Sequence, residues 1–365
     1  MLTNGFSSHG PLVSEVSQAF TKSHALLLIA PLGHGAMHFA IALAKAKLCE
    51  ASPELRQTGA CGACPSCHWF DLGHHPDYRF LGLDTPTEEG ESGSDGEEAP
   101  AKAEPASKKK RKPTQITVDA VKSIENFAAV SGHRGGMRVV VIFPSEALNS
   151  VAANRLLKTL EEPTEGLLFI LVAESVQRLL PTIRSRCQLI KIPPVETVDA
   201  LVWLENQLLE RTPSIAIEKI KDQAKSLLAL AGGAPETALV LADPEVSAIH
   251  RDLLAVIARL PDTSVVDSAG AILGAEPLSF ISTLQRWIED LCRVAAGAQP
   301  RYFVDQSERL RKLVGRSDLR RLTQANHAVI RQRSLASHPL NPRLYCEQAL
   351  NDYCAAFAKP QTSNK

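Results

Sequence analysis

The sequence contains no long hydrophobic run. Its longest apolar stretch near the start covers residues 25–32, whereas a membrane-spanning helix needs about 20 apolar residues. We therefore expect no membrane-spanning segment. The beginning of the sequence has neither a positively charged leader nor a continuous apolar core, so we also expect no secretory signal and a cytoplasmic location.

The sequence also has no excess of charge of either sign. Lysine plus arginine and aspartate plus glutamate each total 40 among the 365 residues. This balance argues against a uniformly basic surface of the kind that binds nucleic acid. An apolar share of 44% and a charged share of 22% exclude a wholly disordered chain. The length excludes a small disulfide-stapled scaffold and, at about 100 to 200 residues per domain, predicts two or three domains.

Residues 84–113 depart from this composition. Their only apolar side chains are four alanines, and eight acidic residues precede the basic run KKKRK at 108–112. Such a segment cannot bury enough apolar surface to offset the entropy lost on ordering, so we predict a disordered insertion. The basic run has two interpretations, a nucleic-acid contact or a solvated loop, and the solvated loop is favoured because such runs are common on loops.

Around this insertion, short apolar runs alternate with helical patterns. The runs predict strands at 25–30, 78–83, 137–143, 167–172 and 188–192. They show little alternation of polar and apolar residues, which is typical of parallel strands covered on both faces. Apolar residues at helical spacing follow Val118, and again follow the capping candidates Asn149 and Ser150. We predict a doubly wound α/β domain over residues 1–195.

After residue 195 only helical patterns remain. The break GGAP at 232–235 falls within a short predicted helical unit at 196–243, and a longer helical domain is predicted at 244–365. In that domain Phe280, Leu284 and Trp287 lie on one apolar stripe. Such a stripe is typical of a helix that packs into a core, and we assign it no binding function.

The first predicted strand leads through a glycine turn into a helix, the context of a phosphate-binding loop. Such a loop needs glycines to bring backbone amides to phosphate, a lysine for the β and γ phosphates and a hydroxyl for magnesium. Gly33 and Gly35 are present, but the first glycine position holds Ala30, the lysine position Ala36 and the hydroxyl position Met37. We predict a vestigial loop without productive ATP binding.

The end of the third predicted strand lacks the acidic pair of an ATPase. Phe143 and Pro144 stand where one carboxylate would hold magnesium and another would position water. Glu146 lies beyond the strand end, and one displaced carboxylate cannot do both. We therefore expect no independent catalysis by this chain.

Four of the eight cysteines crowd into residues 49–67. Cys61, Cys64 and Cys67 form two overlapping C-x2-C units, and Cys49 stands twelve residues upstream. In a reducing compartment this spacing predicts a metal site, for which zinc is the natural ion. Cys49 is the least certain ligand because it ends a predicted helix, and His68 is its substitute. We expect a structural rather than a catalytic site.

The segment TIRSRC at 182–187 places an arginine at the edge of the predicted α/β domain. An arginine in such a position can reach across a subunit boundary and stabilise charge on a transferring phosphoryl group. The alternative is an exposed arginine that forms a surface ion pair.

Longer motifs carry a family resemblance. They are the run NRLLKTLEEPTEGLLFILVAESVQRLLPTIRSRC, the cysteine module behind a glycine-loop helix, the element HHPDY at 74–78 and, near the end, NPRLYCEQAL. Together they resemble the clamp-loader AAA+ subunits of bacterial DNA polymerase III, well over about residues 24–194 and weakly beyond. The resemblance implies an AAA+-type domain with a zinc module, a helical lid and a helical collar.

The resemblance also implies partners and a role. In this family gamma or tau subunits bind ATP and join delta in a ring of five subunits, which opens the sliding clamp and places it on primed DNA. The degraded glycine loop is similar to that of the non-hydrolysing member. Glu236 stands where the ATPases have a lid arginine, so a third nucleotide contact is missing, in agreement with the degraded loop. The alternative is an ATP-hydrolysing motor subunit of the gamma or tau type.

For the non-hydrolysing member, the resemblance implies a residue that acts on a neighbouring subunit. The arginine of the S-R-C motif is lent to the ATP of that neighbour, which carries over to Arg186 with Ser185 and Cys187 beside it. Arg184, two residues earlier, is a competitor for this role.

Overall fold

The computed structural model describes residues 12, 16, 23–52, 59–83, 115–130, 132–133, 136–212, 216–336 and 341–357. The predicted insertion at 84–113, with its basic run, lies outside the described residues. The chain divides into two compact units, Met1–Asp199 and Ala200–Lys365. The predicted three-part division into 1–195, 196–243 and 244–365 stays a prediction.

The first unit is built on one parallel sheet of five strands in the order β2-β3-β4-β1-β5. The strands are β1 (Ala25–Ile29), β2 (Tyr78–Leu81), β3 (Arg138–Ile142), β4 (Leu167–Ala173) and β5 (Gln188–Lys191). Leu27 of β1 pairs with Leu171 of the central strand β4 on one side and with Leu189 of the edge strand β5 on the other. All five strands predicted from the apolar runs are confirmed.

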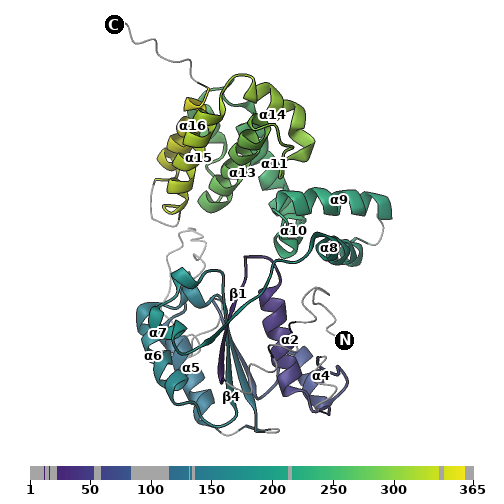
Figure 1. The fold of residues 1–365 in the computed structure, drawn as a ribbon, viewed down its shortest axis with the longest axis vertical. Coiled ribbons are helices and arrows are strands. Elements are labelled where there is room, and N and C mark those ends of the chain that lie inside the picture. Colours follow the sequence, from purple (N-terminus) through teal and green to yellow (C-terminus); the bar gives the residue numbers. More distant parts are fainter. Residues whose placement is uncertain are drawn as a thin grey trace, which may run out of the picture. The chain divides into compact units, whose positions relative to one another are not determined.

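Helices cover both faces of this sheet (Figure 1). Ala25 and Leu27 of β1 pack with α5 (Val118–Ala129) and α6 (Ser150–Glu161), whereas Leu26 and Leu28 pack with α2 (Ala36–Leu48). Because successive side chains of a strand point to opposite faces, both sets must be apolar. This arrangement explains why the strand sequences do not alternate, and it confirms the predicted doubly wound α/β fold with a parallel sheet.

Shorter elements connect the layers. They are α4 (Pro65–Asp71), η3 (Ser145–Ala147), η4 (Val176–Arg178) and α7 (Pro181–Arg184). The predicted cap of α6 is confirmed, since the Asn149 side chain accepts a hydrogen bond from the Ala152 amide at 2.8 Å. A buried guanidinium caps the C-terminal end of α5. Arg138 donates to the carbonyls of Ala128 and Val130 and, through Nη2, to Thr164 Oγ1 at 2.8 Å.

The described part of the second unit contains helices and no strand. The helices are α8 (Thr197–Arg211), which begins at the unit boundary, α9 (Ile217–Leu230), α10 (Pro235–Leu241), α11 (Pro244–Arg259), α12 (Val265–Ala271), α13 (Pro277–Ala295), η5 (Val304–Gln306), α14 (Ser307–Val314), α15 (Leu319–Arg333) and α16 (Pro342–Ala355). Trp287 of α13 is fully buried in their core, and its indole donates to the Tyr353 hydroxyl at 2.9 Å. The prediction that this stripe belongs to the core is confirmed.

A buried carboxylate organises the turn after α13. Asp290 is fully buried and accepts three backbone hydrogen bonds, from Arg301 at 2.6 Å, Tyr302 at 2.9 Å and Phe303 at 2.8 Å. Arg301 in turn donates to the carbonyl of Gly232 at 2.9 Å. These bonds join the GGAP break between α9 and α10 to the longer helices of the second unit.

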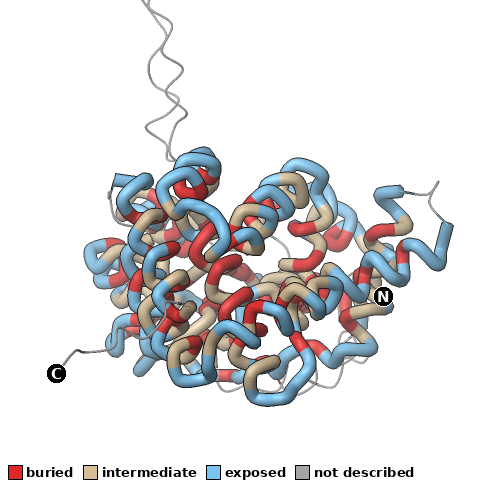
Figure 2. The backbone as a smooth tube through the Cα atoms, turned by 90° about the horizontal axis from the view of Figure 1, so that it is seen from above, coloured by how far each residue is buried: buried red, intermediate tan, exposed pale blue. Residues whose placement is uncertain are grey.

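Buried and exposed positions recur along the helices, as Figure 2 shows. This periodicity is expected when one side of each helix faces a core and the other faces water. Within the described ranges, no helix is both long and apolar enough to cross a membrane.

Candidate functional site

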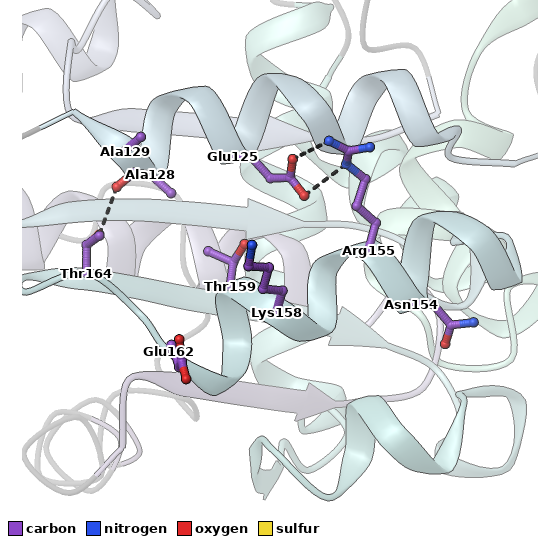
Figure 3. A pocket seen from close by; sticks show the side chains of 9 residues that line it. All are labelled: Glu125, Ala128, Ala129, Asn154, Arg155, Lys158, Thr159, Glu162 and Thr164. Carbon is purple, nitrogen blue, oxygen red and sulfur yellow. Dashed lines mark hydrogen bonds and ion pairs between the residues drawn. The ribbon is translucent and has the colours of Figure 1, made fainter.

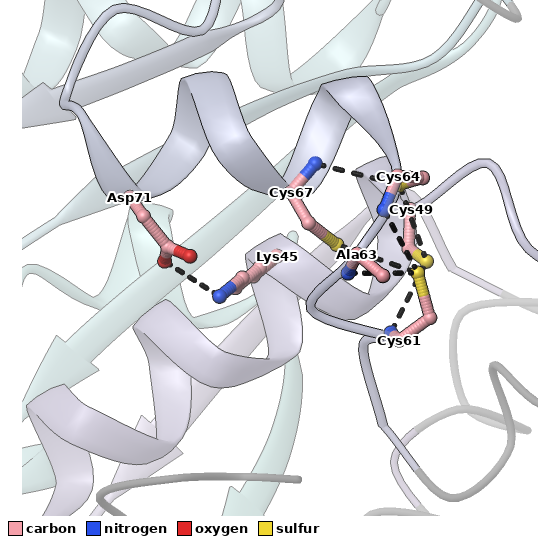
Figure 4. Close-up of polar contacts among 7 residues, drawn as sticks. All are labelled: Lys45, Cys49, Cys61, Ala63, Cys64, Cys67 and Asp71. Atoms are coloured by element: carbon pink, nitrogen blue, oxygen red, sulfur yellow. Dashed lines mark hydrogen bonds and ion pairs between the residues drawn. The ribbon is translucent and has the colours of Figure 1, made fainter.

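The four clustered cysteines meet in space (Figure 4). Their sulfur atoms all lie within 4.8 Å of one another. The Sγ atoms of Cys49 and Cys64 are 3.9 Å apart, and those of Cys61 and Cys67 are 4.0 Å apart. A disulfide would need about 2.0 Å, whereas two thiolates bound to one tetrahedral zinc at about 2.3 Å each are separated by about 3.8 Å. The spacing therefore fits four ligands around one ion.

Backbone amides point at these sulfurs. Cys49 Sγ accepts from the amides of Ala51 and Cys61, and Cys61 Sγ accepts from those of Ala63 and Cys64. The two amide bonds to Cys61 lower the pKa of its thiol to about 6, while burial raises the pKa of Cys67. Amide donors favour thiolates, and several thiolates packed together need a cation to offset their repulsion.

Cys49 belongs to this group and His68 does not. Cys49 follows the last residue of α2 and is buried, whereas His68 lies on the exposed side of α4. The cluster supplies four thiols, the full set for a closed tetrahedral site. Among the described residues, its own apolar core contains four buried side chains, Ala46, Cys49, Ala60 and Cys67, and a bound ion would add stability to this small core.

Two contacts attach this module to the α/β domain. The buried ring of His75 lies 2.7 Å from the hydroxyl of Ser66, next to Cys67 of the cluster, and its Nδ1 accepts from the Asp77 amide at 3.1 Å. Lys45 of α2 pairs with Asp71 of α4 at 2.5 Å (Figure 4). The HHPDY element thus holds the module where it meets β2.

The glycine turn between β1 and α2 has the backbone of a phosphate-binding loop, while Ala36 and Met37 occupy its lysine and hydroxyl positions. Gly33 and Gly35 have φ of 76° and 83°, the left-handed region that glycine adopts without strain. Ala36 begins α2 and is buried, and Met37 packs against the core below the helix. The imidazole of His34, at the centre of the turn, accepts a hydrogen bond from the Val195 amide at 3.2 Å.

Glu146 lies just past β3, as the sequence suggested, and its carboxylate is used within the chain. Its Oε1 accepts hydrogen bonds from the amide of Glu174 and, at 3.0 Å, from that of Ser175. Both amides directly follow β4. The carboxylate therefore connects the carboxyl ends of two neighbouring strands, the edge at which α/β sheets commonly bind ligands.

Arg186 lies between α7 and the edge strand β5. Its Nη1 donates to the Thr182 carbonyl at 3.0 Å and to Ser185 Oγ at 3.3 Å, and its Nη2 forms an ion pair with Glu161. The side chain of Arg186 is 32% exposed, so the guanidinium is accessible to a partner. The surface ion pair considered from the sequence is present as well.

The neighbours of Arg186 differ in environment. Arg184 and Ser185 are exposed, whereas Cys187 is packed against the core of the α/β domain. Burial raises the pKa of the Cys187 thiol to about 12. Cys187 therefore stays protonated at neutral pH, which excludes a thiolate nucleophile at this position.

An open groove of about 610 Å³ lies between α5 and α6 (Figure 3). Across it, Arg155 binds Glu125 through two hydrogen bonds, of 2.9 and 2.6 Å. Lys158 and Thr159 point into the same groove, and Thr164 donates to the Ala128 carbonyl at its end. These groups hold two helices together and include no nucleophile paired with a base.

The polar partners that sequence reasoning missed in these sites include Ser66, Glu161, Glu125 and Arg155. The sequence does not distinguish Glu161 from Glu162, because the two residues are adjacent and have the same side chain. Ser66 could have been suspected from its place between two ligand cysteines, since residues next to metal ligands often orient them. Nothing local links Glu125 to Arg155.

The fold and its sites define a class of protein, a P-loop-like α/β domain that carries a four-cysteine module and a phosphate loop without lysine or hydroxyl. The chain belongs to the DNA polymerase III delta subunit family, whose model matches residues 12–196. This membership confirms the resemblance to clamp-loader subunits.

The relatives of this chain include DNA polymerase III delta' subunits. The chain is 35% identical over 227 residues to the DNA polymerase III subunit delta' of Pseudomonas aeruginosa, covering 62% of this chain and 58% of the relative. It is 31% identical over 265 residues to that of Yersinia pestis, covering 72% and 68%. The matched region spans 58% of the Pseudomonas aeruginosa protein, 59% of its Haemophilus influenzae counterpart and 56% of the Escherichia coli one, so the chain covers less than two thirds of these relatives.

A solved structure of a DNA polymerase III gamma subunit-related protein from Thermotoga maritima covers 95% of this chain and 99% of its own at 14% identity, with a TM-score of 0.39. A TM-score of this size adds nothing to the fold already described.

Proposed function

We propose that this chain works as the delta' subunit of the DNA polymerase III clamp loader. In this role it hydrolyses no ATP itself, helps to load the sliding clamp on primed DNA, and donates Arg186 to ATP bound by a neighbouring subunit. The observation that carries the proposal is an accessible arginine at the edge of a P-loop-like domain whose own phosphate loop lacks the lysine and the hydroxyl.

Two observations support the absence of independent hydrolysis: the side chains in the phosphate loop and the hydrogen bonds of Glu146. Ala36 and Met37 offer no group for phosphate or magnesium. Glu146, the carboxylate nearest to the end of β3, is bound to the amides of Glu174 and Ser175. These two bonds to Oε1 fix the carboxylate beyond the end of β3, and a single carboxylate there cannot supply both the magnesium ligand and the water-positioning group of an ATPase.

The role of Arg186 in a neighbour's site is supported by its chemistry and exposure. A guanidinium stays charged at any physiological pH and can donate to two phosphate oxygens at once. Charge spreads over the oxygens of the transferring phosphoryl group in the transition state, where such donors lower the barrier most. Thr182 and Ser185 bind Nη1 and Glu161 pairs with Nη2, and because this ion pair is exposed and weak, a phosphate group can take the place of Glu161.

We also propose that Cys49, Cys61, Cys64 and Cys67 bind one structural zinc ion. The support is a set of four thiols at tetrahedral spacing, with amide donors to the sulfurs. When bound, zinc would cross-link the end of α2 to the start of α4. The four protein ligands would fill its coordination, so the ion would stabilise the fold and activate no water.

The proposed partners are gamma or tau subunits and delta, in a ring of five subunits, with the sliding clamp and primed DNA as the objects on which the ring acts. In this arrangement residues 1–195 form the AAA+-type domain, 196–243 the lid and 244–365 the collar that joins the subunits. We propose a cytoplasmic location, where replication takes place.

The proposal is tested by reconstituting the clamp loader with candidate gamma or tau and delta subunits. Arg186→Ala should leave assembly intact and lower DNA-stimulated ATPase activity and clamp loading. Losing an arginine that acts in trans costs about 10³-fold at its own site, and less for a ring with several sites. Arg184→Ala tests the competing arginine: normal clamp loading by this variant assigns the role to Arg186, whereas a loss confined to Arg184→Ala assigns it to Arg184.

A second measurement separates the two kinds of subunit. The purified chain, titrated with a fluorescent ATP analogue and magnesium, should show neither micromolar binding nor turnover. Binding with turnover would favour a motor subunit of the gamma or tau type, and normal loading by the Arg186→Ala complex would remove the role given to Arg186.

A further inference from the structure

The guanidinium of Arg186 is held from two directions. One nitrogen, Nη1, is bound by its own turn, through the Thr182 carbonyl at 3.0 Å and Ser185 Oγ at 3.3 Å. The other, Nη2, forms an ion pair with Glu161, which comes from a different element, 25 residues earlier in the sequence. Together these contacts select one rotamer of a long side chain.

Glu161 is itself fixed by the helix that carries it. It is the last residue of α6, whose Leu156 and Leu160 are buried against the sheet. The following Glu162 amide still bonds back to the Lys158 carbonyl at 3.2 Å, and Pro163 then ends the helix. The carboxylate is therefore presented to Arg186 from a rigid support.

The pair is open to water, since the side chains of Arg186 and Glu161 are 32% and 49% exposed. Ion pairs of this kind are weak, so Glu161 cannot trap the guanidinium against a partner with higher charge. A phosphate group carries more charge than a carboxylate and accepts at more oxygens. The pair can therefore orient Arg186 and still yield to a nucleotide phosphate.

We infer that Glu161 is a positioning residue for Arg186: it holds the guanidinium in the rotamer that reaches the nucleotide of the neighbouring subunit. This inference rests on the proposed function of Arg186. The gain comes from preorganisation, because an arginine already ordered loses less side-chain entropy when it meets its ligand. Glu161 needs no contact with the nucleotide.

The test is a double-mutant cycle in the reconstituted clamp loader, with ATP turnover measured under DNA stimulation. Glu161→Ala should lower the turnover number about two- to fivefold, the range for an exposed ion pair, and leave the KM for ATP unchanged. In an Arg186→Ala complex the same substitution should cause no further loss, because there is no guanidinium left to orient. Glu162→Ala removes an equal charge one residue away and should leave turnover unchanged.

The outcomes separate this inference from the proposed function. Wild-type turnover in the Glu161→Ala complex, or an equal loss in the Arg186→Ala background, overturns the positioning role and leaves the role of Arg186 intact. A loss shared by Glu162→Ala overturns it too, since the effect would then follow net charge. If Arg186→Ala itself turns over ATP normally, both the proposed function and this inference fail.

Discussion

The imidazole of His75 and the hydroxyl of Ser66 meet at 2.7 Å with both residues buried. Since His75 Nδ1 accepts from the Asp77 amide, its proton lies on Nε2 and is donated to the serine. The pair links the helix that carries Cys67 to the residues leading into β2. The module is thus attached to the sheet by a polar contact inside the protein.

Replacing His75 should lower the free energy of unfolding of the first unit. His75→Ala leaves the buried Asp77 amide and Ser66 hydroxyl without this partner, which we expect to lower the free energy of unfolding by about 2 to 3 kcal/mol. Urea denaturation followed by circular dichroism measures the change. The control is His68→Ala, which removes an exposed histidine of α4 and should cost no more than about 0.5 kcal/mol. Equal losses in the two variants would contradict the prediction.

The purified protein should contain one zinc ion per chain by elemental analysis. Cys61→Ser should lose the metal, because serine is a poor ligand for zinc and three thiols do not complete the tetrahedron. Cys354→Ser, in the second unit, should keep it. A metal-free wild-type protein, prepared without chelator, would falsify the assignment. Removal of zinc by a chelator should also lower the melting temperature of the first unit.

Arg138 should be irreplaceable by lysine. Its buried guanidinium donates to carbonyls at the end of α5 and to Thr164, and an ammonium group cannot reach acceptors in this forked arrangement. We expect Arg138→Lys to cost about 2 to 4 kcal/mol of unfolding free energy, measured by urea denaturation. Arg155→Lys, at an exposed ion pair, should cost at most about 1 kcal/mol. Similar costs for both would show that the buried bonds add little.

Acid should destabilise the second unit through His250. Burial, followed by the charge of Arg286, lowers the pKa of His250 to about 4, whereas an unfolded histidine titrates near 6.5. Between these values the unfolded chain binds more protons than the folded one, so stability falls as the pH drops from about 6.5 to 4. The loss approaches about 3 kcal/mol at the lower end.

The measurement is the free energy of unfolding of the wild type and of His250→Gln at pH 7, 6 and 5. Glutamine can still donate to Thr283, which lies 3.3 Å from the histidine Nε2, but it does not titrate. The variant should lose less stability than the wild type between pH 7 and 5. Parallel pH profiles would refute the assignment of this loss to His250.

Much of the first unit could be predicted from local sequence. Five apolar runs predicted five strands, and Asn149 predicted the start of α6, because the period of the apolar residues and the capping chemistry are local properties. The spacing of Cys61, Cys64 and Cys67 likewise restricted these thiols to one small loop, and the missing lysine and hydroxyl could be read directly at Ala36 and Met37.

The contacts between elements could not be predicted in this way. Whether Cys49 or His68 joins the other thiols depends on how α2 packs against α4, and the structure selects Cys49. Asp290 had no predicted role, yet it binds three amides from a turn that lies beyond the end of its own helix. In both cases the partners are brought together by packing, which no short window of sequence contains.

The sequence by itself determined where strands and helices of the first unit follow one another along the chain. It also determined the loss of the phosphate-binding groups and the presence of a thiol cluster. Only the tertiary structure decided which of two adjacent glutamates pairs with Arg186. Glu161 and Glu162 have the same side chain, but Glu161 is the last residue of α6, whereas Glu162 follows it with a non-helical backbone (φ −124°, ψ 68°). The packing of α6 turns Glu161 toward Arg186 and Glu162 toward the groove beside α5.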